Sequence, residues 1–336
     1  MRALEIPSFG LDHLALVERP SAPVGPLDVR VRVRAISLNY RDWLMITGQY
    51  NPRQPLPLVP CSDASGEVVE VGSLVTRVRP GDRVVTVFAP RWLSGEPRRD
   101  RIRHTLGGPA PGVLADEIVL HEDGVVRAPA ELSFDEAATI PCAGLTAWSA
   151  LEQCGVTTGQ TVLVQGTGGV SIFALQLARA RGAEVIVTSR SDDKLARAIA
   201  LGARHGINYQ TTPDWAAGAL ERTGGEGVHL VVEVGGKGTF AQSIKATRPG
   251  GSIAVIGILS GAATEIVLSR VLMSNIRVQG IFVGHRDALE AVIAAVVSAG
   301  IRPEISHRFA FEDARAAFSL MREGGHLGKI VVTVQP

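Results

Sequence analysis

A glycine-rich turn between two short apolar segments constrains the fold of this chain more than any other feature. Thr161–Gln165 is rich in β-branched residues and predicts a buried strand, and Glu184–Thr188 predicts a second one. Between them lie the turn GTGG and a segment, 170–181, whose broad apolar face predicts a helix that ends before Gly182. The order is therefore strand, glycine turn, helix and strand.

The glycines of this turn suit the binding of a dinucleotide. A pyrophosphate binds to backbone amides at a helix N-terminus, and only residues without a side chain let it come that close. Ser171 replaces the third glycine of the usual pattern, and it is small enough for the helix to pack on the strand. The alternative is an ordinary βαβ turn that binds nothing. Five consecutive residues are expected at the pyrophosphate: Gly166, Thr167, Gly168, Gly169 and Val170.

The end of the second strand predicts which dinucleotide binds. Enzymes that use NAD place Asp or Glu about 20 residues after the glycines, where it holds the ribose 2′-hydroxyl. This chain has Ser189 and Arg190 there, which can bind a 2′-phosphate, and Lys194 follows in the next helix. The pattern favours NADPH as cofactor, unless Arg190 is only a solvated surface arginine.

Length and composition fit a soluble α/β enzyme. The 336 residues suggest two domains, and 46% of them are hydrophobic. A net charge of +1 gives no sign of a nucleic-acid or membrane partner. The N-terminus does not resemble a signal peptide, no apolar run reaches transmembrane length, and three cysteines form no motif. We therefore expect a cytoplasmic enzyme that acts on a small molecule.

The first third of the chain predicts a β domain. Three valines alternate with three arginines between residues 29 and 34, as in a half-buried strand. Many short strands with frequent turns indicate a small barrel-like domain. A short helix is expected around Trp43–Ile46, and Ser133 with Glu136 has the spacing of a capping box. Further strands are expected at Gly66–Val71, Arg83–Val87, Ile118–Leu120 and Val125–Ala128.

Strands and helices alternate after residue 194, which predicts a parallel sheet with helices on both faces. Strands are expected at Val228–Val234, Ser252–Ile256 and Val278–Val283, and a closing strand at Lys329–Val334. Helices are expected at Lys194–Leu201, Asp214–Thr223, Phe240–Thr247, Ala288–Ala299 and Phe311–Arg322.

The loop 91–108 carries five arginines. It is either a solvated insertion or a lid whose positive charge attracts an anionic substrate.

Several motifs together resemble the medium-chain dehydrogenase/reductase superfamily. They are NYRD at 39–42, PCSDASGEVVEVG at 60–72, PGDRV at 80–84 and GTGGVS at 166–171. Within that superfamily the chain is similar to the zinc-independent, quinone-oxidoreductase-like branch. The resemblance implies a GroES-like domain over residues 1–142, completed by 284–336, and a Rossmann domain over 143–283. It also implies NADPH in the cleft between the domains and a dimer or tetramer.

The resemblance implies site residues as well. Tyr50 matches a tyrosine that enoyl-thioester reductases use near the substrate, where it could donate a hydrogen bond or a proton; alternatively it packs at a loop tip. Asn39 resembles an asparagine near the nicotinamide, and Asp42 resembles its paired acid, which we expect to be structural. Further cofactor contacts are expected from Thr146, Tyr209, Gly257 and Phe282.

Zinc-dependent relatives hold their catalytic zinc with a Cys, a His and a second Cys. The matching positions here are Asn39, Ser62 and Cys142, which make a poor zinc site. The loop between residues 90 and 112, where a structural zinc would bind, has no cysteine. We therefore expect no metal, and we interpret Cys142 as a small buried residue.

Without zinc, a plain ketone lacks the group that polarises its oxygen, whereas a quinone or conjugated C=C spreads the incoming charge. The sequence therefore predicts an NADPH-dependent reductase of quinones or α,β-unsaturated carbonyls. Alcohol or aldehyde oxidoreduction and non-catalytic NADPH binding are the alternatives. A homodimer joined along the predicted edge strand near Ile276–Val283 is also expected, because an uncovered edge exposes unpaired backbone groups. The competing possibility is that a loop or helix covers this edge and the chain stays monomeric.

Overall fold

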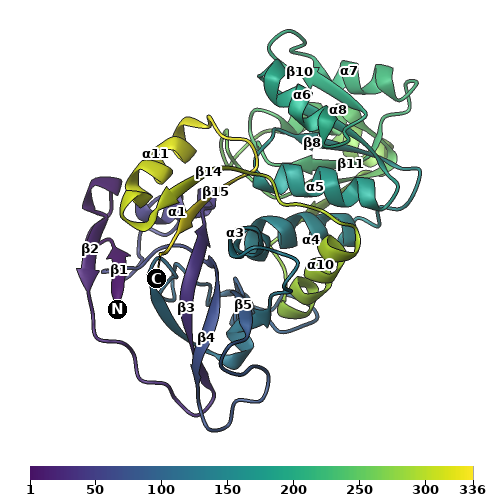
Figure 1. The fold of residues 1–336 in the computed structure, drawn as a ribbon. Helices are drawn as coiled ribbons and strands as arrows, with labels where there is room; N and C mark the ends of the chain where they lie inside the picture. The colour runs from purple at the N-terminus through teal and green to yellow at the C-terminus, as the bar shows by residue number, and fades with distance from the viewer. Residues whose placement is uncertain (336) are drawn as a thin grey trace. The chain divides into compact units, whose positions relative to one another are not determined.

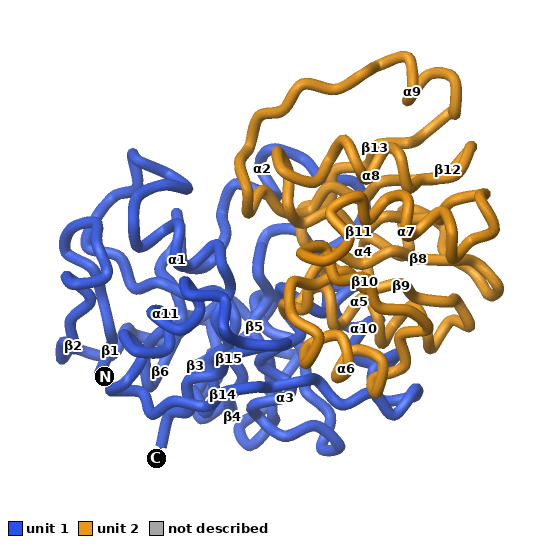
Figure 2. The backbone as a smooth tube through the Cα atoms, turned by 90° about the horizontal axis from the view of Figure 1, so that it is seen from above, with its two compact units in different colours: residues 1–145, 284–336 blue, residues 146–283 orange. Residues whose placement is uncertain are grey.

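The computed structural model describes residues 1–335, which form two compact units (Figures 1 and 2). Unit 1 contains residues 1–145 and the C-terminal segment from residue 284, and unit 2 contains residues 146–283. The chain therefore leaves the first unit once, builds the second, and returns to complete the first.

Unit 2 is built on a six-stranded parallel sheet with the order β10-β9-β8-β11-β12-β13. This is the doubly wound order of a Rossmann domain, in which the strand order reverses between β8 and β11. The α/β fold expected from the sequence is confirmed. The strands are β8 (Thr161–Gln165), β9 (Glu184–Ser189), β10 (His205–Asn208), β11 (Val228–Glu233), β12 (Thr247–Val255) and β13 (Arg277–Gly280).

Of the helices of this unit, α5 to α8 pack on the sheet. Ser171, in the position of the third glycine, is buried, and its hydroxyl donates to the Gln165 carbonyl at 2.7 Å. A small side chain thus lets α5 approach β8, as the sequence predicted. The helices are α4 (Leu145–Gln153), α5 (Gly169–Ala180), α6 (Asp192–Ala200), α7 (Trp215–Arg222), α8 (Phe240–Ala246) and α9 (Leu268–Met273).

Unit 1 contains a seven-stranded sheet in which β14-β15-β3-β4-β5-β7 follow one another and β6 also pairs with β3. The valines of β3 are buried and its arginines are at least partly exposed, which confirms the alternating pattern. Its strands are β3 (Asp28–Ser37), β4 (Asp63–Val71), β5 (Arg83–Thr86), β6 (Glu117–His121), β7 (Val125–Arg127), β14 (Ile305–Ala310) and β15 (Lys329–Thr333), and β1 (Arg2–Glu5) pairs with β2 (Ala15–Glu18) apart from this sheet.

In unit 1, α3 packs against β3 and β4 of this sheet, and α11 packs against β14 and β15 (Figure 1). The capping box expected at α3 is present, because the Ser133 amide donates to Glu136 at 2.8 Å and the Glu136 amide donates to the Ser133 hydroxyl at 3.1 Å. The helices are α1 (Tyr40–Ile46), α2 (Arg99–Ile102), α3 (Phe134–Ala138), α10 (Arg286–Ser298) and α11 (Ala314–Glu323), and a π-helical turn, η3, spans Ile140–Gly144.

The last strand of unit 1 is placed by its pairing with β3. β15 runs antiparallel to β3, with Val331 opposite Ser37, and the Leu38 amide donates to the Ile330 carbonyl at 3.1 Å. Because of this register, Lys329 lies beside the end of β3, where α1 begins.

Some expected elements differ from the observed ones. The strand expected at Val278–Val283 runs only over Arg277–Gly280, so Phe282 lies beyond it. The helix expected from Lys194 begins two residues earlier, with Ser191 as its N-cap. The hairpin of β1 and β2, the short helices α2 and α9 and the π-helical turn were not expected, because each is short and carries little periodic signal.

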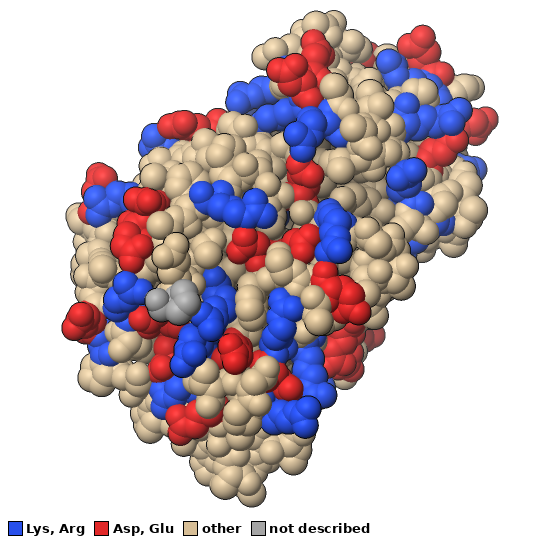
Figure 3. Space-filling model, in the orientation of Figure 1, with Lys and Arg blue, Asp and Glu red and all other residues tan. Residues whose placement is uncertain are grey.

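Acidic and basic side chains are interspersed on the face shown in Figure 3, so no large area of one sign is visible there. Of the helices formed by residues 1–335, none has the length and apolar character needed to cross a membrane.

Candidate functional site

The glycine turn of unit 2 leaves room for a ligand beside its backbone. Gly166 has a φ of 70°, which favours glycine, and its amide donates to the Thr188 carbonyl at 2.8 Å. A Cβ atom at Gly168 would meet no atom within 4 Å. Since α5 begins directly after Gly168, a pyrophosphate can approach the helix N-terminus at this turn.

A cationic pair follows β9, at the same edge of the sheet. Arg190 is exposed and Lys194 is partly exposed in the first turn of α6. Burial, and then the nearby Arg190 guanidinium, lower the pKa of Lys194. Ser189 is buried, and its hydroxyl accepts a hydrogen bond from the Ser191 amide at 3.3 Å. Two neighbouring cations and a hydroxyl are suited to bind a phosphate.

The carboxyl ends of parallel strands share one edge, so this edge gathers most of the expected cofactor residues. The Tyr209 amide donates to the Ser189 carbonyl at 3.1 Å. Gly257 lies so close to the Val234 backbone that a Cβ atom would come within 2.5 Å of its oxygen. Thr146 is buried at the start of unit 2, and Phe282 follows the end of β13.

The sequence-based reasoning missed a buried carboxylate at this edge. Glu233, at the end of β11, accepts hydrogen bonds at Oε1 from the Gly235 and Gly236 amides, at 2.8 and 2.9 Å, and from the Thr239 hydroxyl at 2.6 Å. Its Oε2 accepts from Gln165 Nε2 at 2.8 Å and from the Ser243 hydroxyl. The carboxylate therefore fixes the loop after β11 relative to β8. A single Glu in an apolar strand is the only signal of it in the sequence.

Unit 1 places Asn39 and Asp42 at the start of α1. The Asn39 amide donates to Asp42 Oδ2 at 2.8 Å, so Asp42 satisfies a backbone group at the helix N-terminus. Asp42 is fully buried, and this burial raises its pKa to about 7, against the opposing effect of the Arg41 guanidinium.

A buried lysine binds the Asn39 side chain. Lys329 is 4% exposed, and its ammonium donates to Asn39 Oδ1 at 2.5 Å and to the Leu38 carbonyl at 2.6 Å. Burial raises the pKa of Asp63, and the Lys329 ammonium opposes that effect. The sequence-based reasoning did not select Lys329, because only the pairing of β15 with β3 brings it to this place.

The residues at the zinc-ligand positions do not fit a zinc ion. The amide oxygen of Asn39 binds the Lys329 ammonium, and the Ser62 hydroxyl donates to Asp63 Oδ1 at 2.6 Å. Burial, and then the Asp63 carboxylate, raise the pKa of the Cys142 thiol, which opposes the thiolate that zinc requires. Cys142 as a whole residue is partly exposed, so it is less buried than the sequence suggested, although its thiol is desolvated. Its backbone amide donates to Asp63 Oδ2 at 3.0 Å.

Tyr50 lies after the end of α1 and is 49% exposed. The Arg41 guanidinium is 5.2 Å from the centre of its ring. The phenol is thus accessible on unit 1, whereas Asn39 and Asp42 are buried beneath the surface.

The arginine-rich loop contains the short helix α2 and several contacts of its own. Arg101 donates to the Ser94 and Glu96 carbonyls at 2.9 and 3.3 Å, and Arg98 pairs with Asp100 at 3.5 Å. These contacts within the loop stabilise its shape.

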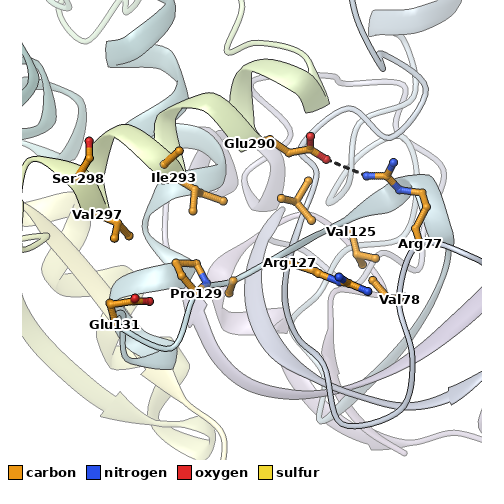
Figure 4. Close-up of a pocket in the computed structure, with 13 residues that line it drawn as sticks. Arg77, Val78, Val125, Arg127, Pro129, Glu131, Glu290, Ile293, Val297 and Ser298 are labelled. Carbon is orange, nitrogen blue, oxygen red and sulfur yellow. Dashed lines mark hydrogen bonds and ion pairs between the residues drawn. The ribbon is translucent and has the colours of Figure 1, made fainter.

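A groove of about 790 Å³ lies elsewhere in unit 1. Figure 4 shows α10 on one side of it and Val125 and Arg127 of β7 on the other, with Arg77 bonded to Glu290 at 2.8 Å near one end. None of the expected site residues lines this groove, so we assign the candidate site to the residues described above.

Comparisons with known proteins identify the family. The alcohol dehydrogenase GroES-like domain matches residues 25–130, and the zinc-binding dehydrogenase domain matches residues 169–298. A zinc-type alcohol dehydrogenase-like protein of Schizosaccharomyces pombe is 40% identical over 318 residues, which cover 93% of this chain and 92% of the relative. The chain belongs to the medium-chain dehydrogenase/reductase superfamily, a family of oxidoreductases.

Two solved structures are similar over almost their whole length. A putative alcohol dehydrogenase from Sinorhizobium meliloti 1021 has a TM-score of 0.93 and 45% identity, with 99% of this chain and 98% of that chain covered. The quinone oxidoreductase from Coxiella burnetii has a TM-score of 0.81 and 28% identity, with 100% and 99% covered.

The buried Asp42 predicts a pH-dependent difference in stability. Between about pH 4 and pH 7 the folded protein binds this proton more tightly than the unfolded chain, so the carboxyl destabilises the fold as pH rises. Asp42→Asn removes this effect. Its unfolding free energy relative to the wild type should therefore increase with pH, by at most about 1.4 kcal/mol per unit, and level off above pH 7.

Urea unfolding at several pH values measures this difference. Asp100→Asn, at an exposed position, is the control and should show no such trend. A difference between Asp42→Asn and the wild type that is independent of pH would contradict the raised pKa.

Proposed function

We propose that the protein is an NADPH-dependent reductase that transfers hydride to a quinone or an α,β-unsaturated carbonyl without zinc. The observation that carries this proposal is the Lys329 ammonium on Asn39 Oδ1, at a position where zinc-dependent relatives have a ligand. With the Lys329 ammonium and the Cys142 thiol in place of a metal, substrates that delocalise the incoming charge themselves are favoured.

The cofactor would bind along the carboxyl edge of the unit 2 sheet. The turn 166–170 would bind the pyrophosphate, and Ser189, Arg190 and Lys194 would bind the 2′-phosphate. NADPH supplies the hydride when it is bound. On unit 1, the accessible Tyr50 phenol would donate a hydrogen bond or proton to the acceptor, and the buried Asp42 would hold the start of α1.

A second candidate is alcohol or aldehyde oxidoreduction, which the names of the S. pombe relative and the S. meliloti structure favour. A third is NADPH binding without catalysis. Metal content separates the first two candidates, and turnover separates both from the third.

The experiment measures NADPH oxidation with a panel of quinones, enones and simple aldehydes, together with zinc content by elemental analysis. We expect turnover with quinones or enones, substoichiometric zinc, and unchanged rates after chelation. One zinc per chain, with activity lost on its removal, would establish the alcohol dehydrogenase alternative. Tight NADPH binding without oxidation by any acceptor would indicate a non-catalytic protein.

The choice of cofactor predicts the behaviour of Arg190→Ala. A charge-assisted hydrogen bond contributes about 1.5–3 kcal/mol, so the Kd of NADPH should rise roughly 10- to 100-fold, while that of NADH should change little. Titration by fluorescence or calorimetry measures both constants. Arg204→Ala, at another exposed arginine of unit 2, is the matched control. Equal losses for NADPH and NADH would show that Arg190 is structural.

We also propose a homodimer formed through β13 and α9. Within residues 1–335, β13 pairs only with β12, so its other edge is unpaired. Large apolar side chains are exposed in α9, the helix that directly precedes β13 in the chain, including Leu272 at 73% and Met273 at 80%. An exposed apolar patch next to a free strand edge is suited to pair with a second copy about a twofold axis.

Light scattering at micromolar concentration should give the mass of a dimer. Leu272→Glu with Met273→Glu should convert it to a monomer, because two charges would be buried in the interface. Leu74→Glu, at an exposed leucine of unit 1, should leave the dimer intact. A monomeric wild-type protein would refute the proposal, and a dimer that survives the double substitution would place the interface elsewhere.

A further inference from the structure

Arg41 connects α1 to a distant part of unit 1. Its Nη1 donates to the Leu106 carbonyl at 2.8 Å, and its Nη2 donates to the Thr105 hydroxyl at 2.8 Å and to the Gly108 carbonyl. The acceptors are all at the C-terminal end of the arginine-rich loop. One guanidinium thus fixes this end of the loop to the helix that begins at the candidate site.

The same guanidinium contacts two aromatic rings. Its central carbon is 5.2 Å from the centre of the Tyr50 ring and 4.9 Å from the centre of the Phe88 ring. A planar guanidinium can stack on aromatic faces while its N–H groups bind acceptors in its own plane, which a lysine ammonium cannot do. Phe88 is buried, so it supports Arg41 from the core.

The backbone and the side chain of Tyr50 have different surroundings. Its backbone is fixed, because its amide donates to the Leu44 carbonyl at 3.0 Å. Its side chain is half exposed, and within residues 1–335 its hydroxyl has no hydrogen-bond partner. The hydroxyl is therefore available to a ligand, and the Arg41 guanidinium contacts the ring that carries it.

We propose that Arg41 is a positioning residue that orients Tyr50 toward the hydride acceptor and couples this orientation to the end of the arginine-rich loop at residues 105–108. The proposal rests on the proposed function, in which Tyr50 donates to the acceptor oxygen. Because the effect acts through Tyr50 on unit 1, it changes turnover of the acceptor and leaves the affinity of unit 2 for NADPH unchanged.

A double-mutant cycle tests whether Arg41 acts through Tyr50. Tyr50→Phe should lower kcat with the best quinone or enone by about 100-fold, as expected for loss of a general acid, and Arg41→Met by about tenfold. The double variant should be no slower than Tyr50→Phe alone, since residues that act through one contact are not additive. The Kd of NADPH should stay constant in all three. Arg322→Met removes another arginine that faces a ring, Trp43 at 5.6 Å, and should leave kcat unchanged.

A second measurement, ¹⁹F NMR, reports on the environment and mobility of the Tyr50 ring. The chain has three tyrosines, so 3-fluorotyrosine gives three ¹⁹F resonances, and Tyr50→Phe identifies that of Tyr50. Arg41→Met should shift and narrow this resonance, and Arg322→Met should not. If Arg41→Met does not fold, Arg41→Lys replaces it in both measurements, because it keeps the charge but loses the planar contact.

Losses in kcat that multiply in the double variant, or a Tyr50 resonance that does not respond to Arg41, would overturn the proposal. If none of the tested acceptors supports oxidation of NADPH by the wild-type protein, the proposed function is wrong. The ¹⁹F spectra still decide in that case whether Arg41 orients Tyr50.

Discussion

The candidate site of unit 1 depends on the burial of one ammonium group. A buried ammonium is costly unless hydrogen bonds and an opposite charge compensate it. The Lys329 ammonium donates to two oxygen atoms, Leu38 O and Asn39 Oδ1. Its charge also opposes the rise that burial causes in the pKa of Asp63. Asp63 in turn accepts from Ser62 and from the backbone of Cys142. Segments from four parts of the chain are therefore held together by hydrogen bonds and electrostatic attraction.

This arrangement explains why the C-terminal strand belongs to the first unit. Lys329 is the first residue of β15, and the antiparallel pairing with β3 brings it beside Asn39. Two hydrogen bonds fix the start of α1. Lys329 donates to the side-chain oxygen of Asn39, and the backbone amide of Asn39 donates to the Asp42 carboxylate. Arg41, in the first turn of the same helix, contacts the Tyr50 ring and donates hydrogen bonds to the loop at 105–108. A rigid buried layer thus supports an accessible phenol, which is an arrangement suited to binding a polar acceptor atom.

Unit 2 contains a buried acidic side chain, Glu233, that is also held by several hydrogen bonds. Glu233 is fully buried at the end of β11 and accepts only from N–H and O–H donors. These hydrogen bonds offset the cost of burying a polar group in the interior. Glu233 holds the loop that follows β11, next to Gly257, at the edge where the strand order reverses. In each unit, one buried and hydrogen-bonded side chain, Lys329 or Glu233, therefore fixes the backbone near the candidate site residues.

The sequence by itself determined those features that local physics controls. The glycines at 166–169, the β-branched strands and the Ser133 capping box are each specified by neighbouring residues, and the structure has them as expected. The ends of strands and helices that lack such signals were less predictable. The strand β13, for example, ends at Gly280 rather than at residue 283. Only the tertiary structure decided the distant partners of Lys329, Glu233 and Arg41, which lie up to 291 positions away. Such contacts depend on which strands pair and in which register, and no short segment of the chain encodes that choice.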